Sequence, residues 1–137
     1  MFSTIMVPVD LVHKDTLAKA LDAAGDMAKR YGAMIKVVSV GGEMPSELGH
    51  NADEFTETVT GFAQGLRDKY GVEVEAETII SHDPEVETTS ALMKAIDRTG
   101  ADLVIMASHV PGVLEHIFSS HGGYIAQHAK VSVFIVR

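Results

Sequence analysis

Three segments of this chain share one order: an amphipathic stretch, then a glycine, then an apolar run. The glycines are Gly32, Gly71 and Gly100. Before each glycine, apolar residues recur at spacings of three and four, which is typical of a helix with one buried face. A glycine just past the last turn supplies the left-handed residue that closes a helix. The pattern predicts three helices, each followed at once by a strand.

The apolar spacing also predicts which faces of these helices are buried. The faces comprise Leu17, Ala20, Leu21, Ala24, Ala28 and Tyr31 in the first helix, Phe55, Val59, Phe62, Ala63, Leu66 and Tyr70 in the second, and Val86, Leu92, Met93 and Ile96 in the third. Capping signals precede two of them. Asn51 and Glu54 have the spacing of a capping box, and Asp83 with Pro84 offers a cap and a preorganised first residue.

Five apolar runs alternate with these helices and with a fourth helix before the last run. The predicted strands span residues 4–9, 34–40, 72–80, 103–107 and 131–136. Strands that alternate with helices are typical of a parallel sheet with helices on both faces, joined by right-handed crossovers. A length of 137 residues is typical of one domain. We therefore predict a single α/β domain spanning residues 1–137.

Strand composition indicates which strands lie at the edges of the sheet. The first and fourth runs are apolar throughout, as central parallel strands are. Glu73, Glu75 and Glu77 alternate along the third run and predict a charged edge. The last run, Val131 to Val136, is apolar although it comes last. We expect a homodimer through this strand; the alternative is a strand covered by its own helix.

Composition excludes several classes of protein. The chain has no cysteine, so disulfides and cysteine-ligated metals are excluded. Its formal net charge of −8, with lysine and arginine scattered, would repel nucleic-acid backbones and anionic lipid. No apolar run is long enough to span a membrane, and the first ten residues lack the cationic leader of a signal peptide. We expect a cytoplasmic protein that binds neither nucleic acid nor membranes.

The strand order predicts where a ligand would bind. In an open parallel sheet, ligands bind beyond the carboxyl ends of the strands, where the strand order reverses. In this chain that place is a crevice between Asp10 and residues 107–112, which follow the first and fourth strands. Asp10 would accept hydrogen bonds from ribose hydroxyls or a base amine. The alternative is that Asp10 caps the following helix.

Small and hydroxyl-bearing residues lead into the last helix. Ser119, Ser120, Gly122 and Gly123 would let backbone N–H groups approach an anion at a helix N-terminus. Each glycine costs a helix about 1 kcal/mol relative to alanine, which favours close approach as the reason for the pair. His121 could help to hold an anion when protonated. The alternative is an ordinary serine cap.

The whole chain resembles the universal stress protein family. The resemblance is carried by Ile5-Met6-Val7-Pro8-Val9-Asp10, by Val104-Ile105-Met106-Ala107-Ser108-His109 and by the segment from Gln127 to Arg137. The short Ala-Ser-His-x-Pro form at residues 107–111 resembles one branch of that family. The resemblance implies a five-stranded sheet ordered 3-2-1-4-5, ATP or another adenine nucleotide (AMP or ADP) in the crevice, with or without Mg²⁺, and dimerisation through the fifth strand. It leaves open whether dimers pair into tetramers.

The resemblance also implies site residues by position. They are Pro8, Val9, Asp10 and Val40 around adenine and ribose, Met106, Ala107, His109 and Val110 on the side of the fourth strand, and Ser119, Ser120, His121 and Gly122 around the phosphates. The family's ATP-binding members carry Gly-x2-Gly-x9-Gly-(Ser/Thr). Here Ala107, Val110 and Ser119 stand at the glycine positions, and one residue is missing from the spacer. Because valine does not easily take a positive φ, this departure favours an alternative, a nucleotide-independent stress-related interaction protein of the same fold.

The sequence lacks the side chains that phosphoryl transfer or metal-assisted catalysis would need. The chain has no Gly-x4-Gly-Lys-(Ser/Thr), and no lysine or arginine lies in the predicted phosphate loop to offset the charge of phosphoryl transfer. His109, His116, His121 and His128 do not form a carboxylate–histidine motif of helical spacing. We predict a regulatory protein of the stress response with an unidentified protein partner and no metal site, with weak ATP hydrolysis left open.

Overall fold

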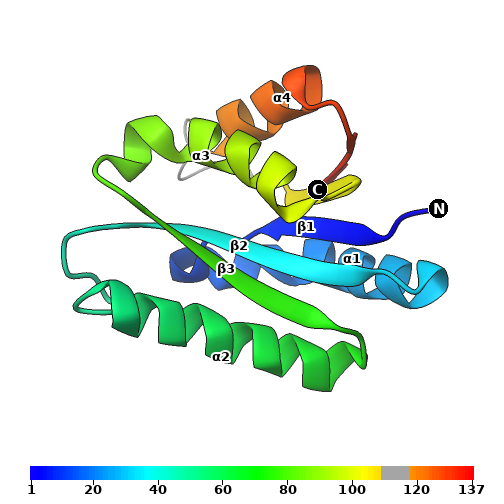
Figure 1. Cartoon of the computed structure of the whole chain (residues 1–137), viewed down its shortest axis with the longest axis horizontal. Helices are drawn as coiled ribbons and strands as arrows, with labels where there is room; N and C mark the ends of the chain where they lie inside the picture. The colour runs from blue at the N-terminus through cyan, green and yellow to red at the C-terminus, as the bar shows by residue number, and fades with distance from the viewer. Residues whose placement is uncertain (109–117) are drawn as a thin grey trace.

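The computed structural model describes residues 1–108 and 118–137 as one α/β sandwich of helices around a parallel sheet (Figure 1). The elements are β1 (Thr4–Pro8), the 3-10 helix η1 (Leu11–Leu17), α1 (Ala18–Tyr31), β2 (Met34–Gly42), α2 (Ala52–Tyr70), β3 (Val74–Ser81), α3 (Pro84–Thr99), β4 (Leu103–Ala107), α4 (Phe118–His128) and β5 (Ser132–Val136). The sheet order is β3-β2-β1-β4-β5, and each pair of neighbours is parallel. The predicted fold class and strand order are confirmed.

The sheet is covered on both faces. Figure 1 shows α1 and α2 below the sheet and α3 and α4 above it. Side chains alternate accordingly along β1. Ile5 and Val7 belong to the apolar cluster between the sheet and helices α1 and α2, and Met6 belongs to the cluster between the sheet and helices α3 and α4. All three are fully buried. A strand apolar on both faces therefore lies at the centre of the sheet, as its composition predicts.

The predicted helix ends are confirmed. Gly32, Gly71 and Gly100 follow α1, α2 and α3 with φ of 65°, 66° and 68°, the left-handed conformation that a glycine adopts without strain. At the start of α2, the Asn51 side chain accepts a hydrogen bond from the Glu54 N–H at 3.0 Å. Asp83 stands at the cap position of α3 but its side chain makes no capping hydrogen bond, so Pro84 at the first turn is the stronger local signal.

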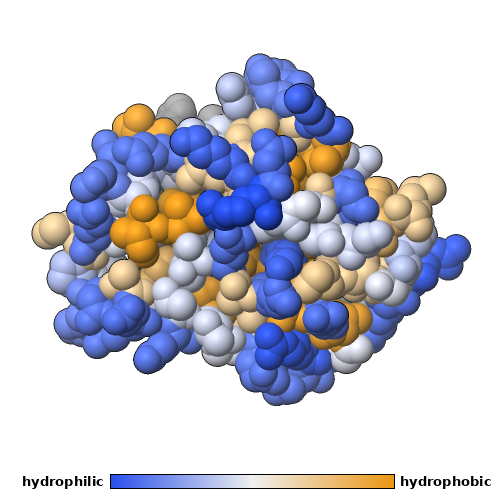
Figure 2. All heavy atoms as spheres, in the orientation of Figure 1, coloured by the Kyte–Doolittle hydropathy of each residue, from blue (hydrophilic) through white to orange (hydrophobic). Residues whose placement is uncertain are grey.

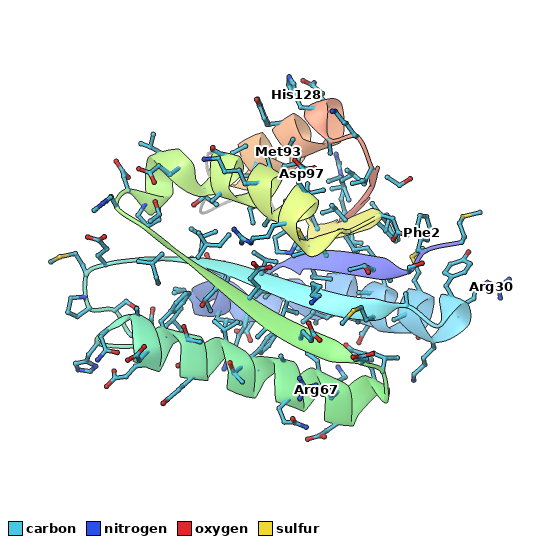
Figure 3. All side chains as sticks on the ribbon, in the orientation of Figure 1. Phe2, Arg30, Arg67, Met93, Asp97 and His128 are labelled. Carbon is cyan, nitrogen blue, oxygen red and sulfur yellow. The ribbon has the colours of Figure 1, made fainter. Side chains whose placement is uncertain are left out.

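The prediction that Val86 is buried is wrong. Val86 is 76% exposed. At about 100° per residue it lies on the opposite side of α3 from Ala95, which is fully buried. Val86 instead lines an open groove with Met93, Asp97 and Tyr124, and Figure 3 shows Met93 and Asp97 between α3 and α4. The other three residues predicted for this face agree with the structure, because Leu92 and Ile96 are buried and Met93 packs against the same cluster.

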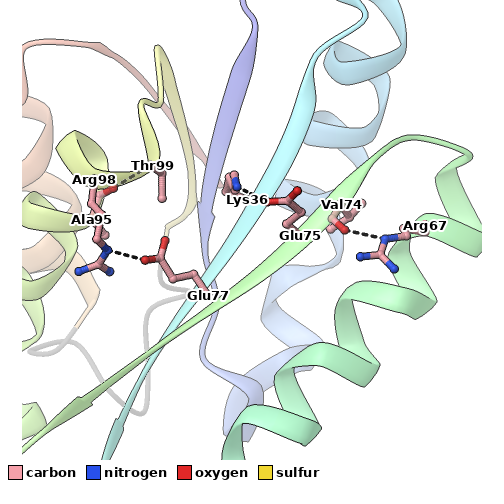
Figure 4. A network of polar contacts seen from close by, with 8 residues as sticks. All are labelled: Lys36, Arg67, Val74, Glu75, Glu77, Ala95, Arg98 and Thr99. Atoms are coloured by element: carbon pink, nitrogen blue, oxygen red, sulfur yellow. Dashed lines mark hydrogen bonds and ion pairs between the residues drawn. The ribbon is translucent and has the colours of Figure 1, made fainter.

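The two edges of the sheet differ in chemistry. On β3, Glu77 pairs with Arg98 of α3 and Glu75 pairs with Lys36 of β2 (Figure 4), which confirms a charged edge. On β5, Phe134 is 43% exposed, whereas Val133 and Ile135 pack into the cluster under α3 and α4. The helix α4 therefore covers one face of β5 and leaves Phe134 uncovered.

The surface mixes polar and apolar side chains. Figure 2 shows the apolar residues as separate patches between hydrophilic ones on the face in view. Among the helices that the structure describes, none is long and apolar enough to cross a membrane.

We expect alanine to have opposite effects on stability at the glycine that ends α2 and at a glycine inside α2. Replacing Gly71 with alanine should lower the free energy of unfolding by about 1 kcal/mol, because alanine at positive φ is strained. The control is Gly61→Ala, in the exposed interior of the same helix with no atom within 4 Å of an added Cβ; it should raise stability by about 0.5–1 kcal/mol. Urea unfolding of both variants measures this, and equal effects would contradict the assignment.

Candidate functional site

A cavity of about 190 Å³ lies at the carboxyl ends of β1, β2 and β4, under α3 and α4. Most of its lining is apolar. The described residues that line it are Pro8, Val9, Asp10, Leu17, Val38, Val40, Pro84, Thr88, Leu92, Met106, Ala107 and His121. The cavity therefore occupies the place where the strand order reverses, which is where ligands bind in sheets of this class.

The cavity exists because β1 and β4 part before they end. Their ladder pairs Ile5 with Leu103 and Met6 with Val104, although β1 continues to Pro8 and β4 to Ala107. Successive N–H groups of a strand point to opposite neighbours, and the Val9 N–H donates to Val38 O of β2 at 2.9 Å. The backbone nitrogen of residue 8 therefore faces β4, and proline has no N–H to give.

Asp10 stands at the mouth of this cavity, directly after β1. Its Oδ1 accepts a hydrogen bond from the Val12 N–H at 3.1 Å, and its Oδ2 lies 2.9 Å from His13 Nδ1. Asp10 therefore caps η1, as the alternative has it, and its role in binding a ligand stays a prediction. Capping does not exhaust the carboxylate, because each oxygen can accept a second hydrogen bond. The side chain is one-third exposed and lines the cavity at the same time.

His121 joins the two helices above the cavity. It lies in the first turn of α4, is 8% exposed, and its Nδ1 forms a hydrogen bond with the Thr89 hydroxyl of α3. Burial lowers the pKa of His121 below its ordinary value of 6.5, because the charged imidazolium loses its water. His121 therefore brings a neutral ring to the cavity at pH 7.

The structure brings together seven of the residues predicted for the site. Those that line the cavity are Pro8, Val9, Asp10, Val40, Met106, Ala107 and His121. Ser119 and Ser120 lie in the first turn of α4. His109 and Val110 lie outside the described residues, as does His116. The predicted roles of these residues in holding a nucleotide stay predictions.

Gly122, predicted to lie beside a phosphate, is not among the described residues that line the cavity. It is buried, and an added Cβ would lie 3.4 Å from Ile135 Cδ1 of β5, which is an ordinary van der Waals contact. Packing against β5 therefore does not require a glycine at this position. An added Cβ at Gly123 would meet no atom within 4 Å.

Five lining residues escaped prediction: Leu17, Val38, Pro84, Thr88 and Leu92. Three of them recur at a spacing of four along α3, which places them in one row of the helix. The sequence contains a sign of this row, because Thr88 is a polar residue between the apolar Pro84 and Leu92. Sequence spacing does not say that α3 lies over the ends of β1 and β2, so the row could not be connected with the crevice.

A metal centre has no support in the described part of the chain. Within residues 1–108 and 118–137, no three histidine, aspartate or glutamate side chains come close enough to share a metal ion. Among the described residues that line the open groove between α3 and α4, Asp97 is the one carboxylate, and no histidine lines it.

The sheet order and the crevice at the ends of β1 and β4 define a doubly wound α/β protein. The model of the universal stress protein family matches residues 1–137, and this chain belongs to that family. It is 24% identical to universal stress protein G of Salmonella typhimurium and 25% identical to that of Escherichia coli O157:H7, over the full length of both chains in each case.

Solved structures share the fold. The structure of a universal stress protein from Archaeoglobus fulgidus superposes with a TM-score of 0.74 at 18% identity, covering 100% of both chains. A universal stress protein in complex with cAMP superposes with a TM-score of 0.72 at 19% identity, covering 99% of this chain and 97% of its own. A universal stress protein from A. fulgidus in complex with dAMP superposes with a TM-score of 0.69 at 18% identity, covering 98% of both chains.

The lowered pKa of His121 predicts a direction of pH dependence. Between the lowered folded value and 6.5, the unfolded chain binds the proton more readily than the folded chain does. The contribution of His121 to stability is therefore fully present above pH 6.5 and is lost as the pH falls below it. An NMR titration of the His121 ring should give a midpoint below 6.5, and a midpoint at or above 6.5 would contradict the burial argument.

Proposed function

We propose that this chain is a nucleotide-binding regulatory protein of the stress response, which binds an adenine nucleotide (ATP, ADP or AMP) in the crevice at the ends of β1 and β4. One observation carries the proposal: among its described lining residues, the cavity combines apolar walls with one carboxylate, Asp10, at its mouth. An apolar slot accommodates a planar base, and a carboxylate accepts hydrogen bonds from ribose hydroxyls or a base amine.

Two further observations support a nucleotide as the ligand. Relatives of the same fold were solved in complex with cAMP and with dAMP. The phosphate end would be received by the first turn of α4, where His121 borders the cavity and the N–H groups have no partner within the helix. Mg²⁺ would then be held by the phosphates rather than by a protein cage.

The protein would act by binding rather than by catalysis. Among the described lining residues there is no lysine or arginine to stabilise the charge that develops in phosphoryl transfer. A bound nucleotide would instead bias the surface that a partner protein recognises. We place this activity in the cytoplasm.

A second candidate function has its own observation. Phe134 is 43% exposed on an edge strand whose outer backbone pairs with no other described strand. An apolar edge of this kind fits a second copy of the chain, paired through β5. In the nucleotide-independent alternative, the dimer or a tetramer built from it would be the whole functional unit.

Nucleotide binding predicts a rise in thermal stability. At a hundredfold excess of ligand over its Kd, binding adds about 2.7 kcal/mol to the free energy of unfolding, or about 10 °C in Tm for a domain of this size. Asp10→Asn should reduce that shift to less than half, because asparagine keeps the cap but loses the acceptor charge. Differential scanning fluorimetry with AMP and ATP measures the shift.

The matched control is Asp15→Asn, which removes the same charge from an exposed position of η1. It should leave the nucleotide shift unchanged. An unaltered shift in the Asp10→Asn variant would show that ligand binds elsewhere, and the absence of any shift would favour the nucleotide-independent function.

If the chain dimerises through β5, one substitution on that strand should halve the mass of the particle in solution. Phe134→Asp places a charge on the exposed apolar edge and should convert a dimer to a monomer in sedimentation velocity. Met44→Asp, at an 80% exposed residue in the loop after β2, is the control and should sediment as the parent does. A parent protein that sediments as a monomer at about 50 µM would rule out a β5 dimer with a Kd of ~5 µM or below.

A further inference from the structure

We propose that the crevice selects its adenine ligand by charge, so that adenosine and adenosine monophosphate bind more tightly than ATP. This inference rests on the proposed function and goes beyond it, because it names the charge class of ligand that the same site accepts. Two features of the described residues carry it: the charge of the lining and the direction in which nearby cations point. The size of the cavity indicates which part of the ligand it encloses.

Among the lining residues that the structure describes, one carries a formal charge, and that charge is negative. Among the described residues that border the cavity, Asp10 is the one carboxylate, and no lysine or arginine borders it. The His13 ring lies 2.9 Å from the Asp10 carboxylate and is thus directed at the protein's own anion. His121 is buried, and burial lowers its pKa, so it adds no cation at neutral pH.

The cations of the covering helices serve other surfaces. Lys94 of α3 lines two open hollows away from the cavity, one with Tyr124 and the other with Ile80. Arg98 pairs with Glu77 at the β3 edge. The sequence from residue 107 to residue 129 contains no lysine or arginine but does contain Glu115. Neither the described lining nor the sequence of residues 107–129 therefore offers a lysine or arginine to a polyphosphate, in a protein of net charge −8.

The volume of the cavity indicates that it encloses the base rather than a whole nucleotide. Its volume of about 190 Å³ lies below the roughly 300–1,000 Å³ that is usual for sites enclosing a whole drug-sized ligand. The apolar walls supplied by Val38, Leu92 and Met106 suit a base. Each phosphate added to that ligand contributes negative charge without gaining a cationic partner, and repulsion from Asp10 and from the net charge increases with every addition.

The test is calorimetric titration of the full chain with adenosine, AMP and ATP, in EDTA and low salt. We expect AMP to bind about tenfold more tightly than ATP, an order of magnitude set by unscreened repulsion over about 10 Å. At 0.5 M NaCl (roughly a 4 Å Debye length) the ratio should shrink toward one. A steric cause would leave the ratio independent of salt, and that result would overturn selection by charge.

A charge-introducing variant gives a second test. Thr88→Lys places an ammonium group on the lining of the cavity and should raise the affinity for ATP relative to adenosine by about tenfold. Thr88→Gln, of similar length and no charge, is the matched control and should keep the parental ranking. Circular dichroism confirms that both variants fold. A Lys variant with the parental ranking would overturn the inference.

The failure of this inference differs from the failure of the proposed function. If ATP binds at least as tightly as AMP in low salt, the adenine site stands and selection by charge is wrong. If none of the three ligands binds, the proposed function fails and the inference fails with it.

Discussion

The parting of β1 from β4 is the constraint on which the rest of this structure depends. The two strands pair at Ile5 and Met6 and then separate, because Pro8 presents no N–H toward β4 where the next ladder bond would form. On its other side β1 stays paired with β2 as far as Pro8. The gap therefore opens toward β4 alone, and the chain places Asp10 at its mouth.

The same geometry explains why the site is apolar with one charge. The side chains that face the gap come from the ends of central strands, which must be apolar to be buried on both faces. Polar groups can enter only after the strands end or from the helices above, and Asp10, Thr88 and His121 enter in these ways. Two of these three also stabilise the fold, Asp10 by capping η1 and His121 by bonding to Thr89 of α3. Binding and folding thus share residues, and substitutions at the site must be judged against their effect on stability.

Local chemistry made much of the fold predictable. The glycines after α1, α2 and α3 and the capping residue Asn51 act within one turn, so their roles follow from sequence. The alternating glutamates of β3 and the apolar β1 likewise predicted an edge and a centre. Val86 is exposed although Leu92 and Ile96 of the same predicted face are buried, because spacing does not say how far along a helix its apolar face is covered. Leu92 and Thr88 of the site were missed for a related reason: they belong to a helix that reaches the crevice only in three dimensions.

The most direct test of this account is a ¹⁵N–¹H NMR titration of the protein with adenosine, which carries no phosphate and so reports on the cavity alone. The account predicts saturable shifts of the backbone amides of Val9, Asp10, Val40 and Ala107, around the gap between β1 and β4. Shifts confined to the groove between α3 and α4, at Met93 and Tyr124, would contradict it.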